Sequence, residues 1–143
     1  MGIPLKSLPE HVQAQLASKP QGKAKAVHAR CRKHTPHVMN KSERLYAGHL
    51  DVLMRAGEIQ AYWFEGITLR LSDGNRYTAD FVVIDAAGEV WLHDVKGRKG
   101  DSFWAEEDAM AKIKSAAGIF PWFGFLIVWP NKSGGWNKRE LGA

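Results

Sequence analysis

The sequence predicts a single α/β domain in which helices flank a central mixed sheet. Three observations support this prediction: a helical repeat of apolar residues over 40–57, two β-type runs around a glycine-containing turn over 76–95, and a continuously apolar run at 123–129. The chain has 143 residues, of which 45% are hydrophobic and 24% charged, as expected for a globular protein that buries a core.

The first predicted helix covers residues 40–57. Tyr46, Leu50 and Leu53 recur at the spacing of one face of an α-helix. Gly57 follows the last apolar position and is well placed to end the helix, because glycine readily adopts the left-handed conformation found there. Three more apolar residues widen the predicted buried stripe: Leu45, Val52 and Met54.

Three strands are predicted after this helix. They cover residues 67–71, 76–84 and 89–95. Asp73-Gly74 marks the turn between the first two, and residues 86–88 form the turn of a β-hairpin between the second and third.

A second helix and a fourth strand complete the predicted core. The helix is expected over about 102–117, with Gly118 as its stop, and the strand over 123–129. A strand reached through a crossover helix normally lies parallel to its neighbour, so the sheet is expected to be mixed. The predicted buried stripe of the helix consists of Phe103, Met110, Ile113 and Ala117.

The register of the hairpin decides which charged residues meet. A three-residue turn with Gly88 in the left-handed conformation places Asp80 opposite Asp94. Directly opposed residues have Cβ atoms about 4.5–5.5 Å apart, so the carboxylates repel unless a cation lies between them. Lys96 shares the face of Asp94 because side chains alternate along a strand. A two- or four-residue turn would instead put His93 opposite Asp80.

Glu43 is a third acid with two open interpretations. It lies on the stripe of Tyr46 and Leu50, so it is expected to point towards the sheet, where it could join the two aspartates. Asn40-Lys41-Ser42-Glu43 also matches a capping box, in which the glutamate bonds back to the cap residue.

The basic charge is concentrated in an N-terminal arm, residues 1–39. Residues 1–41 hold eight Lys and Arg against Glu10 alone, although the whole chain carries only +5. Four of the six prolines lie in the arm, which indicates an extended segment with a short helix near Glu10–Ala17. The arm suits a phosphate-rich partner, or it is a solvated tail. Its candidate phosphate contacts are Arg30, Arg32 and Lys33.

The residues Asp80 and Asp94-Val95-Lys96 resemble the D…(D/E)xK signature of the PD-(D/E)XK nuclease superfamily. The predicted order over residues 40–130 is similar to the α-β-β-β-α-β core of that superfamily. More narrowly, SERLYAGHLDVLMRAGEI, YTADFVV and HDVKG resemble small phage and prophage proteins of Holliday-junction-resolvase-like type. The sequence departs from the signature at Ala79, where the signature places proline.

The resemblance implies a metal-dependent endodeoxyribonuclease. Asp80, Asp94 and the Val95 backbone carbonyl would bind Mg²⁺ or Mn²⁺, and Glu43 would hold a metal-bound water or a second ion. Lys96 would orient or deprotonate the attacking water. The substrate would be DNA, with branched DNA preferred, cut by a homodimer that needs no small-molecule cofactor. A non-cleaving nucleic-acid-binding protein, or a nuclease for ordinary duplex, flaps or RNA, is the alternative.

Further basic residues are candidate contacts for nucleic acid. Arg98 and Lys99 directly follow Val95-Lys96-Gly97, where a loop at the strand end would meet a phosphate backbone. Lys112 and Lys114 on the second helix have the same role in the resembling family, with simple solvation as the alternative. Trp136, in a basic C-terminal tail over 131–143, could stack on unpaired bases or pack against the core.

Histidines occur at two places where they could bind a metal ion or a substrate. Cys31-x2-His34-x2-His37 supplies three zinc ligands but no evident fourth, so a phosphate-contacting segment is preferred. His93 is expected on the strand face opposite the acids, with substrate contact as the alternative.

The sequence predicts a cytoplasmic protein without a membrane segment. No apolar run approaches the ~20 residues that a spanning helix needs, and Met1–Glu10 lacks a signal-peptide core. The single cysteine, Cys31, suits a reducing compartment. The resemblance to phage and prophage proteins implies a bacterial host cell.

Overall fold

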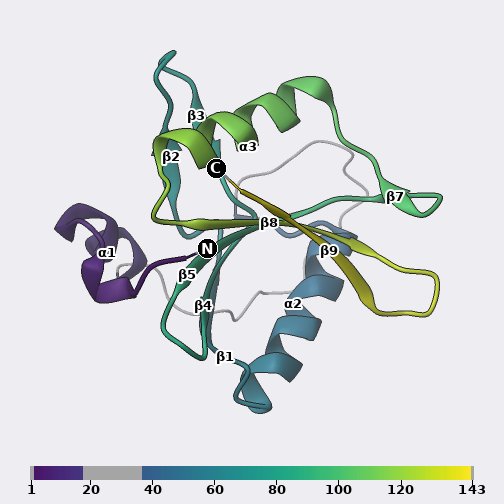
Figure 1. The fold of residues 1–143 in the computed structure, drawn as a ribbon. Coiled ribbons are helices and arrows are strands. Elements are labelled where there is room, and N and C mark those ends of the chain that lie inside the picture. Colours follow the sequence, from purple (N-terminus) through teal and green to yellow (C-terminus); the bar gives the residue numbers. More distant parts are fainter. Residues whose placement is uncertain (1, 18–36, 143) are drawn as a thin grey trace.

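A computed structural model describes residues 2–17 and 37–142 of the chain. It has an α/β architecture with a mixed five-stranded sheet in the order β1-β4-β5-β8-β9 (Figure 1). This confirms the predicted class of a mixed sheet flanked by helices. The helices of the described residues are a short 3₁₀ turn (Leu5–Ser7), α1 (Glu10–Ala17), α2 (Lys41–Arg55) and α3 (Glu107–Ile119).

The sheet is an antiparallel meander extended by a parallel strand. β1 pairs with β4 and β4 with β5, both antiparallel, and α3 then carries the chain across to β8, which lies parallel to β5. The last strand, β9, returns antiparallel to β8. These strands are β1 (Ile59–Phe64), β4 (Phe81–Asp85), β5 (Val90–Val95), β8 (Gly124–Pro130) and β9 (Trp136–Leu141).

Two short ribbons lie outside the main sheet. One pairs β2 (Thr68–Arg70) with β3 (Arg76–Thr78), and the other pairs β6 (Arg98–Lys99) with β7 (Ser102–Phe103). Each ribbon adjoins one of the two segments that carry the predicted acids and lysine, so the ribbons border the candidate site described below.

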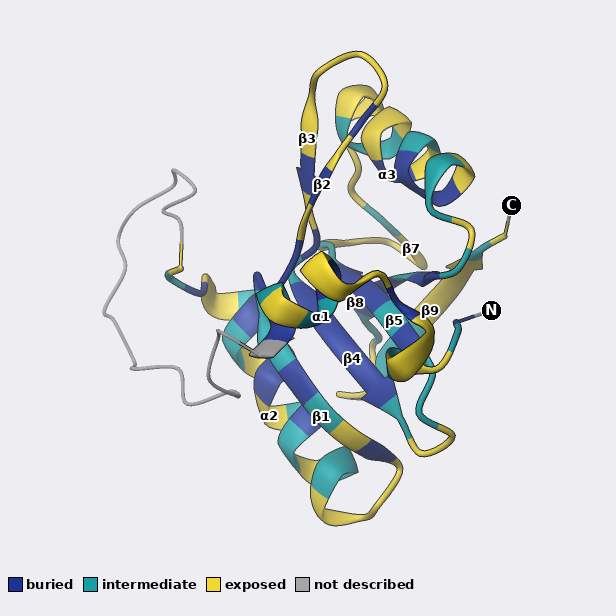
Figure 2. Cartoon of the chain, turned by 90° about the vertical axis from the view of Figure 1, so that its left-hand side faces the viewer, coloured by how far each residue is buried: buried dark blue, intermediate teal, exposed yellow. Residues whose placement is uncertain are grey.

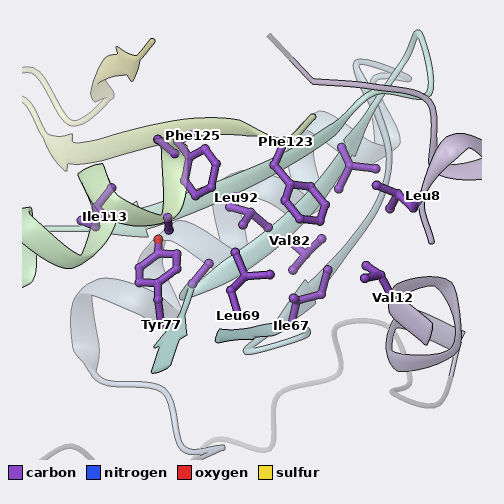
Figure 3. Close-up of a cluster of buried hydrophobic side chains, with 14 of the residues drawn as sticks. Leu8, Val12, Ile67, Leu69, Tyr77, Val82, Leu92, Ile113, Phe123 and Phe125 are labelled. Carbon is purple, nitrogen blue, oxygen red and sulfur yellow. The ribbon is translucent and has the colours of Figure 1, made fainter. Parts of the chain in front are cut away.

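The main sheet separates two hydrophobic clusters. One cluster joins the sheet to α1, α3 and the β2–β3 ribbon, and Figure 3 shows Leu8, Val12, Ile113 and Tyr77 within it. The other cluster joins the opposite face to α2 through buried residues such as Leu50. The central strands are therefore covered on both faces, and Figure 2 shows β4 largely buried.

The ends of α2 follow the sequence prediction. Asn40 and Glu43 form a reciprocal capping box at its start. At its end Gly57 has φ +78°, and the N–H groups of Gly57 and Glu58 donate to the carbonyls of Met54 and Leu53, as in a Schellman motif. The predicted stripe was too wide, however, because Leu45 and Val52 are exposed on the outer side of the helix.

The first strand of the main sheet was predicted at the wrong position in the sequence. The strand that opens the sheet is β1, which the sequence analysis did not predict, whereas residues 67–71 belong to the β2–β3 ribbon. The register of β1 against β4 shifts between Ile59 and Ala61, so β1 contains a bulge. A bulge breaks the two-residue alternation of side chains, which explains why the pattern escaped recognition.

The predicted strand 76–84 is divided in two. β3 ends at Thr78 and β4 begins at Phe81, with Ala79 and Asp80 between them. Ala79 is fully buried, so the apolar pattern runs on without interruption although the backbone changes partners at this point. The break places Asp80 where the ribbon meets the sheet.

The second helix begins later and ends later than predicted. Residues 102 and 103 form β7, and α3 runs from Glu107 to Ile119, with Gly118 inside it. Phe103 therefore packs from the ribbon, with its ring centroid 4.9 Å from that of Trp129, and not from the helix. Ile113 and Ala117 do face the core, as predicted.

Both terminal segments are more structured than predicted. The short helix expected at Glu10–Ala17 is confirmed as α1, but Leu8, Val12 and Leu16 are buried, so this part of the arm docks on the sheet. The residues expected as a C-terminal tail from 131 include β9, an edge strand. Residues 18–36, the rest of the arm, lie outside the described residues.

We expect Gly124→Ala to destabilise the protein. Gly124 pairs directly with Trp91 across β8 and β5, and a Cβ atom at Gly124 would overlap the indole ring. Overpacking of this kind costs about 1–3 kcal/mol, which urea denaturation would measure.

Gly48→Ala is the matched control for this change. No part of the described structure beyond the local helix backbone lies within 4 Å of a Cβ atom there, and Gly48 is inside α2. Alanine should therefore raise stability by about 0.5–1 kcal/mol. Equal effects of the two substitutions would contradict the packing of Trp91 on Gly124.

Candidate active site

The register of the hairpin is the one that brings the two aspartates together. Gly88 has φ +82°, and the Asp85 N–H donates to the Glu89 carbonyl at 3.0 Å across the three-residue turn. Phe81 pairs with His93, so the next residues along the two strands are Asp80 and Asp94. The predicted pairing is confirmed, and the alternative with His93 opposite Asp80 is excluded.

Asp80 continues the β4–β5 ladder with its side chain. Its Oδ2 accepts the Val95 N–H at 2.7 Å, where a backbone carbonyl of β4 would otherwise accept. The Asp80 carbonyl accepts the N–H of Glu65 at 2.8 Å, beyond the end of β1. These bonds hold the Asp80 carboxylate at the point where the chain passes from β3 of the ribbon to β4 of the main sheet.

Asp94 lies on the central strand β5 and is 5% exposed. The hydroxyl of Tyr77, from β3, donates to its Oδ2. Val90 and Leu92 precede Asp94 at two-residue steps and belong to the cluster under α3, so the Asp94 side chain is on that same face. The ribbon therefore positions a neutral donor on one oxygen of the carboxylate.

The two carboxyl groups are costly to ionise together. Burial raises the pKa of Asp80 well above its usual range, and the charge of Asp94 raises it further. Burial also raises the pKa of Asp94. A fold gains nothing from placing two carboxylates side by side where both are shielded from water, so the pair is a candidate functional site on physical grounds.

Lys96 lies beside both aspartates, as the strand alternation predicted. Its N–H donates to the Val128 carbonyl at 2.9 Å, which extends the β5–β8 pairing by one residue. Its ammonium group lowers the pKa of Asp80 and of Asp94, opposing the effect of burial. The side chain is half-buried, so it supplies a positive charge at the mouth of the acid pair.

Both interpretations of Glu43 are compatible with the structure. Its Oε2 accepts the Asn40 N–H at 2.7 Å, and its own N–H donates to the Asn40 Oδ1 at 2.9 Å, which is the capping box. The same carboxylate is 5% exposed and is close enough to Asp80 to raise its pKa. Glu43 therefore caps α2 and also contributes negative charge to the site.

Glu43→Gln should separate these two roles. Glutamine can still accept the Asn40 N–H, so we expect the free energy of unfolding to change by less than about 0.5 kcal/mol. The negative charge is lost, so the affinity of the acid pair for Mg²⁺, measured by calorimetric titration, should fall by about 10- to 100-fold, the usual effect of removing a supporting group at a metal. Unchanged Mg²⁺ affinity would leave Glu43 with the capping role alone.

The acid pair suits a hard divalent cation. Burial raises the pKa of both carboxyls, and the charge of Asp94 raises that of Asp80 further. A cation between them would favour the ionised forms, and oxygen ligands are those that Mg²⁺ and Mn²⁺ prefer. Within residues 2–17 and 37–142, no group of three or more His, Cys, Asp or Glu side chains is arranged to hold a metal ion. Mg²⁺ commonly uses one or two carboxylates plus waters and substrate oxygens, so the pair meets that requirement.

The Val95 carbonyl is on the same side of its strand as Asp80. The Val95 N–H points to the Asp80 carboxylate, and in an antiparallel ladder the N–H and C=O of one residue point to the same neighbouring strand. This backbone oxygen is therefore directed to the side of the strand from which Asp80 approaches, as its predicted role requires.

The other predicted contacts divide into three groups. Arg98 and Lys99 are exposed on β6, two and three residues beyond Lys96. Lys112 and Lys114 are exposed on α3. Lys112 lies near Asp73 at the tip of the β2–β3 ribbon, where hydrogen bonds from Asn75 lower the pKa of that carboxyl and the charge of Lys112 adds a smaller effect. Arg30, Arg32, Lys33, Cys31 and His34 lie outside the described residues.

His37 of the Cys31-His34-His37 motif and Trp136 of the C-terminal segment both contact other residues of the described structure. The His37 N–H donates to the Glu65 Oε2 at 2.7 Å, and its ring Nδ1 lies 3.3 Å from the same oxygen. Trp136 packs edge-on against Tyr46, with 4.8 Å between ring centroids, which favours the packing role over stacking on bases.

Sequence reasoning missed three residues at this site. Tyr77 and Glu65 contact Asp94 and Asp80 as described above, and Trp104 follows the β6–β7 ribbon with its side chain exposed. Tyr77 could have been suspected, because it lies three residues before Asp80 in a strand. Glu65 and Trp104 are in loops, where no periodicity predicts a contact.

His93 lies on the opposite face of β5 from the acids, as predicted. It is buried against α2, where its Nδ1 lies 2.7 Å from the Tyr46 hydroxyl. Both residues line a groove of about 690 Å³ between α2 and the β8–β9 edge, together with His49 and Trp136. Burial, with smaller effects from Lys138 and His49, lowers the pKa of His93 to about 3, so its ring is neutral.

His93 should make the protein sensitive to mild acid. Folded His93 binds fewer protons than unfolded histidine between pH about 3 and 6.5, so stability falls as the pH falls through this window. The expected slope is about 1.4 kcal/mol per pH unit below pH about 6. Urea denaturation of wild type and His93→Gln at several pH values should give two curves that differ by this slope. His49, Asp80 and Asp94 also have shifted pKa values but are present in both proteins, so their contributions cancel in the difference. Parallel curves would contradict the prediction.

Comparison with protein-family models, with curated proteins and with solved structures found no match in any of the three. None of the described helices is long and apolar enough to cross a membrane.

Proposed function

We propose that the protein is a divalent-metal-dependent endonuclease that hydrolyses DNA phosphodiester bonds with a PD-(D/E)XK-type site. The observation that carries the proposal is the pairing of the half-buried Asp80 with the buried Asp94 at adjoining strand ends, with Lys96 on the same face. A cation-free role in folding is a poor explanation, because burial and mutual repulsion both oppose ionisation of the pair.

The order of elements supports the proposal. α2, β1, β4, β5, α3 and β8 follow one another as α-β-β-β-α-β, with three antiparallel strands and a parallel fourth. This is the order expected from the resemblance, once β1 replaces residues 67–71 as the first strand. The acids then come from the second and third strands of the meander.

The proposed roles follow from position. A divalent ion, when bound, supplies an activated water at neutral pH and polarises the phosphoryl group under attack. Asp80 and Asp94 offer the carboxylate oxygens, and the Val95 N–H orients Asp80 through its bond to Oδ2. Tyr77 orients Asp94 by donating to it. Lys96 places a positive charge where the attacking water and the charged phosphate would meet.

Basic residues beside the site support a nucleic-acid substrate. Arg98 and Lys99 are exposed two and three residues beyond Lys96. Phosphate contacts of this kind position a strand without reading its sequence. Branched DNA is the preferred substrate and a homodimer the preferred assembly, both by resemblance, because paired cuts across a junction need two sites.

Cleavage of a panel of end-labelled nucleic acids tests the proposal. Four-way junction, flap, plain duplex, single-stranded DNA and RNA would each be incubated with Mg²⁺, with Mn²⁺ or with EDTA. We expect metal-dependent cleavage that EDTA abolishes, with the junction cut fastest. A salt-sensitive gel shift without cleavage of any substrate would instead support a non-cleaving binding protein.

A further inference from the structure

Trp104 presents an exposed indole beside the proposed active site. Three large hydrophobic residues are exposed in the described structure, and Trp104 is the most exposed of them, at 62%. The backbone N–H of Trp104 donates to the Gly97 carbonyl at 2.8 Å. A Cβ atom at Gly97 would lie 4.0 Å from Cδ1 of the indole, so the ring lies against the residue that follows Lys96.

The β6–β7 ribbon fixes the backbone of Trp104. Arg98 pairs with Phe103 in the ribbon, and Phe103 packs on Trp129 of the main sheet, with Arg139 of β9 5.1 Å from its ring. Trp104 comes directly after Phe103, so its backbone is fixed at both the Phe103 and the Gly97 side. An aromatic side chain on a fixed backbone leaves only its own rotation to be restricted when it binds a ligand, which lowers the entropic cost of binding.

The indole is accompanied by positive charge. The Lys99 ammonium lies 4.2 Å from the centroid of the Trp104 ring, a cation–π contact, and Arg98 is exposed on the same strand. An exposed aromatic ring with adjacent cations is suited to one kind of ligand, a nucleotide whose base stacks on the ring while its phosphates meet the cations.

We propose that Trp104, with Lys99 and Arg98, binds an unpaired nucleotide of a DNA strand next to the scissile phosphate. Bases in a continuous duplex are already stacked and cannot lie against a side chain at the surface, so the site selects DNA with unpaired bases, whether in a single-stranded segment or at a branch point. The position of the scissile phosphate rests on the proposed function of Asp80, Asp94 and Lys96. The stacking itself depends only on the ribbon.

Binding measured in EDTA isolates this site from cleavage. Fluorescence anisotropy would follow a short single strand, a blunt duplex of the same sequence, and that duplex with a single-stranded tail. Trp104→Ala should weaken binding of the single strand and the tailed duplex by about 5- to 150-fold, the loss of one stacked base. Its effect on the blunt duplex should stay below about 2-fold, and Trp104→Phe should keep most of the affinity, since it retains a ring.

Leu45→Ala is the matched control, because Leu45 is also a large exposed apolar residue, at 58%, but lies on α2. It should leave all three affinities unchanged. Equal weakening of blunt and tailed duplex by Trp104→Ala, no weakening of either, or no binding of any oligonucleotide would overturn the inference. Stacking through Trp104 without cleavage in Mg²⁺ or Mn²⁺ would uphold the inference and contradict the nuclease proposal. If Trp104→Ala cleaves tailed DNA as fast as the wild type does, the nuclease proposal is upheld and the inference about Trp104 is contradicted.

Discussion

Asp94→Asn should reduce metal-dependent cleavage by about 10³-fold or more while leaving the fold at least as stable as the wild type. The loss of activity follows from removing one of the two carboxylates that would hold the ion, whose contribution to charge stabilisation is several kcal/mol. The substitution is isosteric, and the amide oxygen can still accept the Tyr77 hydroxyl.

The stability expected for Asp94→Asn follows from the electrostatics of the two aspartates. Burial raises the pKa of Asp94, and the charge of Asp94 raises the pKa of Asp80, so near pH 7 the ionised pair opposes folding in the absence of metal. A neutral side chain at residue 94 removes that repulsion. Thermal denaturation in EDTA should therefore give a melting temperature equal to or above that of the wild type.

Metal addition completes the test of Asp94→Asn. Mg²⁺ should raise the melting temperature of the wild type, because an ion that binds only the folded state stabilises it, and should not raise that of the variant. Asp101→Asn is the matched control, since Asp101 is an exposed carboxylate in the β6–β7 turn. Full cleavage by Asp94→Asn, or the same Mg²⁺ response in both proteins, would contradict the proposed site.

Lys96→Met should reduce cleavage by about 10²- to 10³-fold while the response to Mg²⁺ persists. Methionine keeps much of the apolar stem and removes the charge, so the effect reports electrostatic stabilisation of the reacting phosphate rather than packing. The Lys96 ammonium lowers the pKa of both aspartates, so without metal the variant should also be less stable near pH 7. Cleavage rates and melting temperatures with and without Mg²⁺ measure both effects.

Lys6→Met is the matched control for Lys96→Met. Lys6 is exposed beside Leu5, whose N–H donates to the Gly88 carbonyl at the hairpin turn, the opposite end of β5 from Lys96. This control should retain wild-type cleavage. If Lys96→Met cleaves normally, or loses its Mg²⁺ response, the role proposed for Lys96 is incorrect.

Local sequence patterns were sufficient for much of the fold. The helical stripe, Asn40 and Gly57 predicted α2 within about two residues at each end, because caps and periodicity are properties of neighbouring residues. Gly88 predicted the register of the β4–β5 hairpin, because a three-residue turn needs a left-handed residue at that position. That register is what paired Asp80 with Asp94.

Patterns failed where a strand is irregular or changes partners. β1 was missed because its bulge breaks the alternation, and the buried Ala79 concealed the point at which the chain passes from ribbon to sheet. β9 was expected as a tail, since three of its residues are exposed and charged, as is usual on an edge strand.

The sequence by itself determined which residues could form the site: the two aspartates, the lysine on their face and the turn that aligns them. These depend on strand alternation and turn geometry, which act over a few residues. Only the tertiary structure decided what surrounds them, namely Tyr77 from the β2–β3 ribbon, Glu43 from the start of α2 and Trp104 from the β6–β7 ribbon. The physical reason is that these groups meet through packing of separate elements, and no local pattern specifies where a ribbon or a helix end will dock.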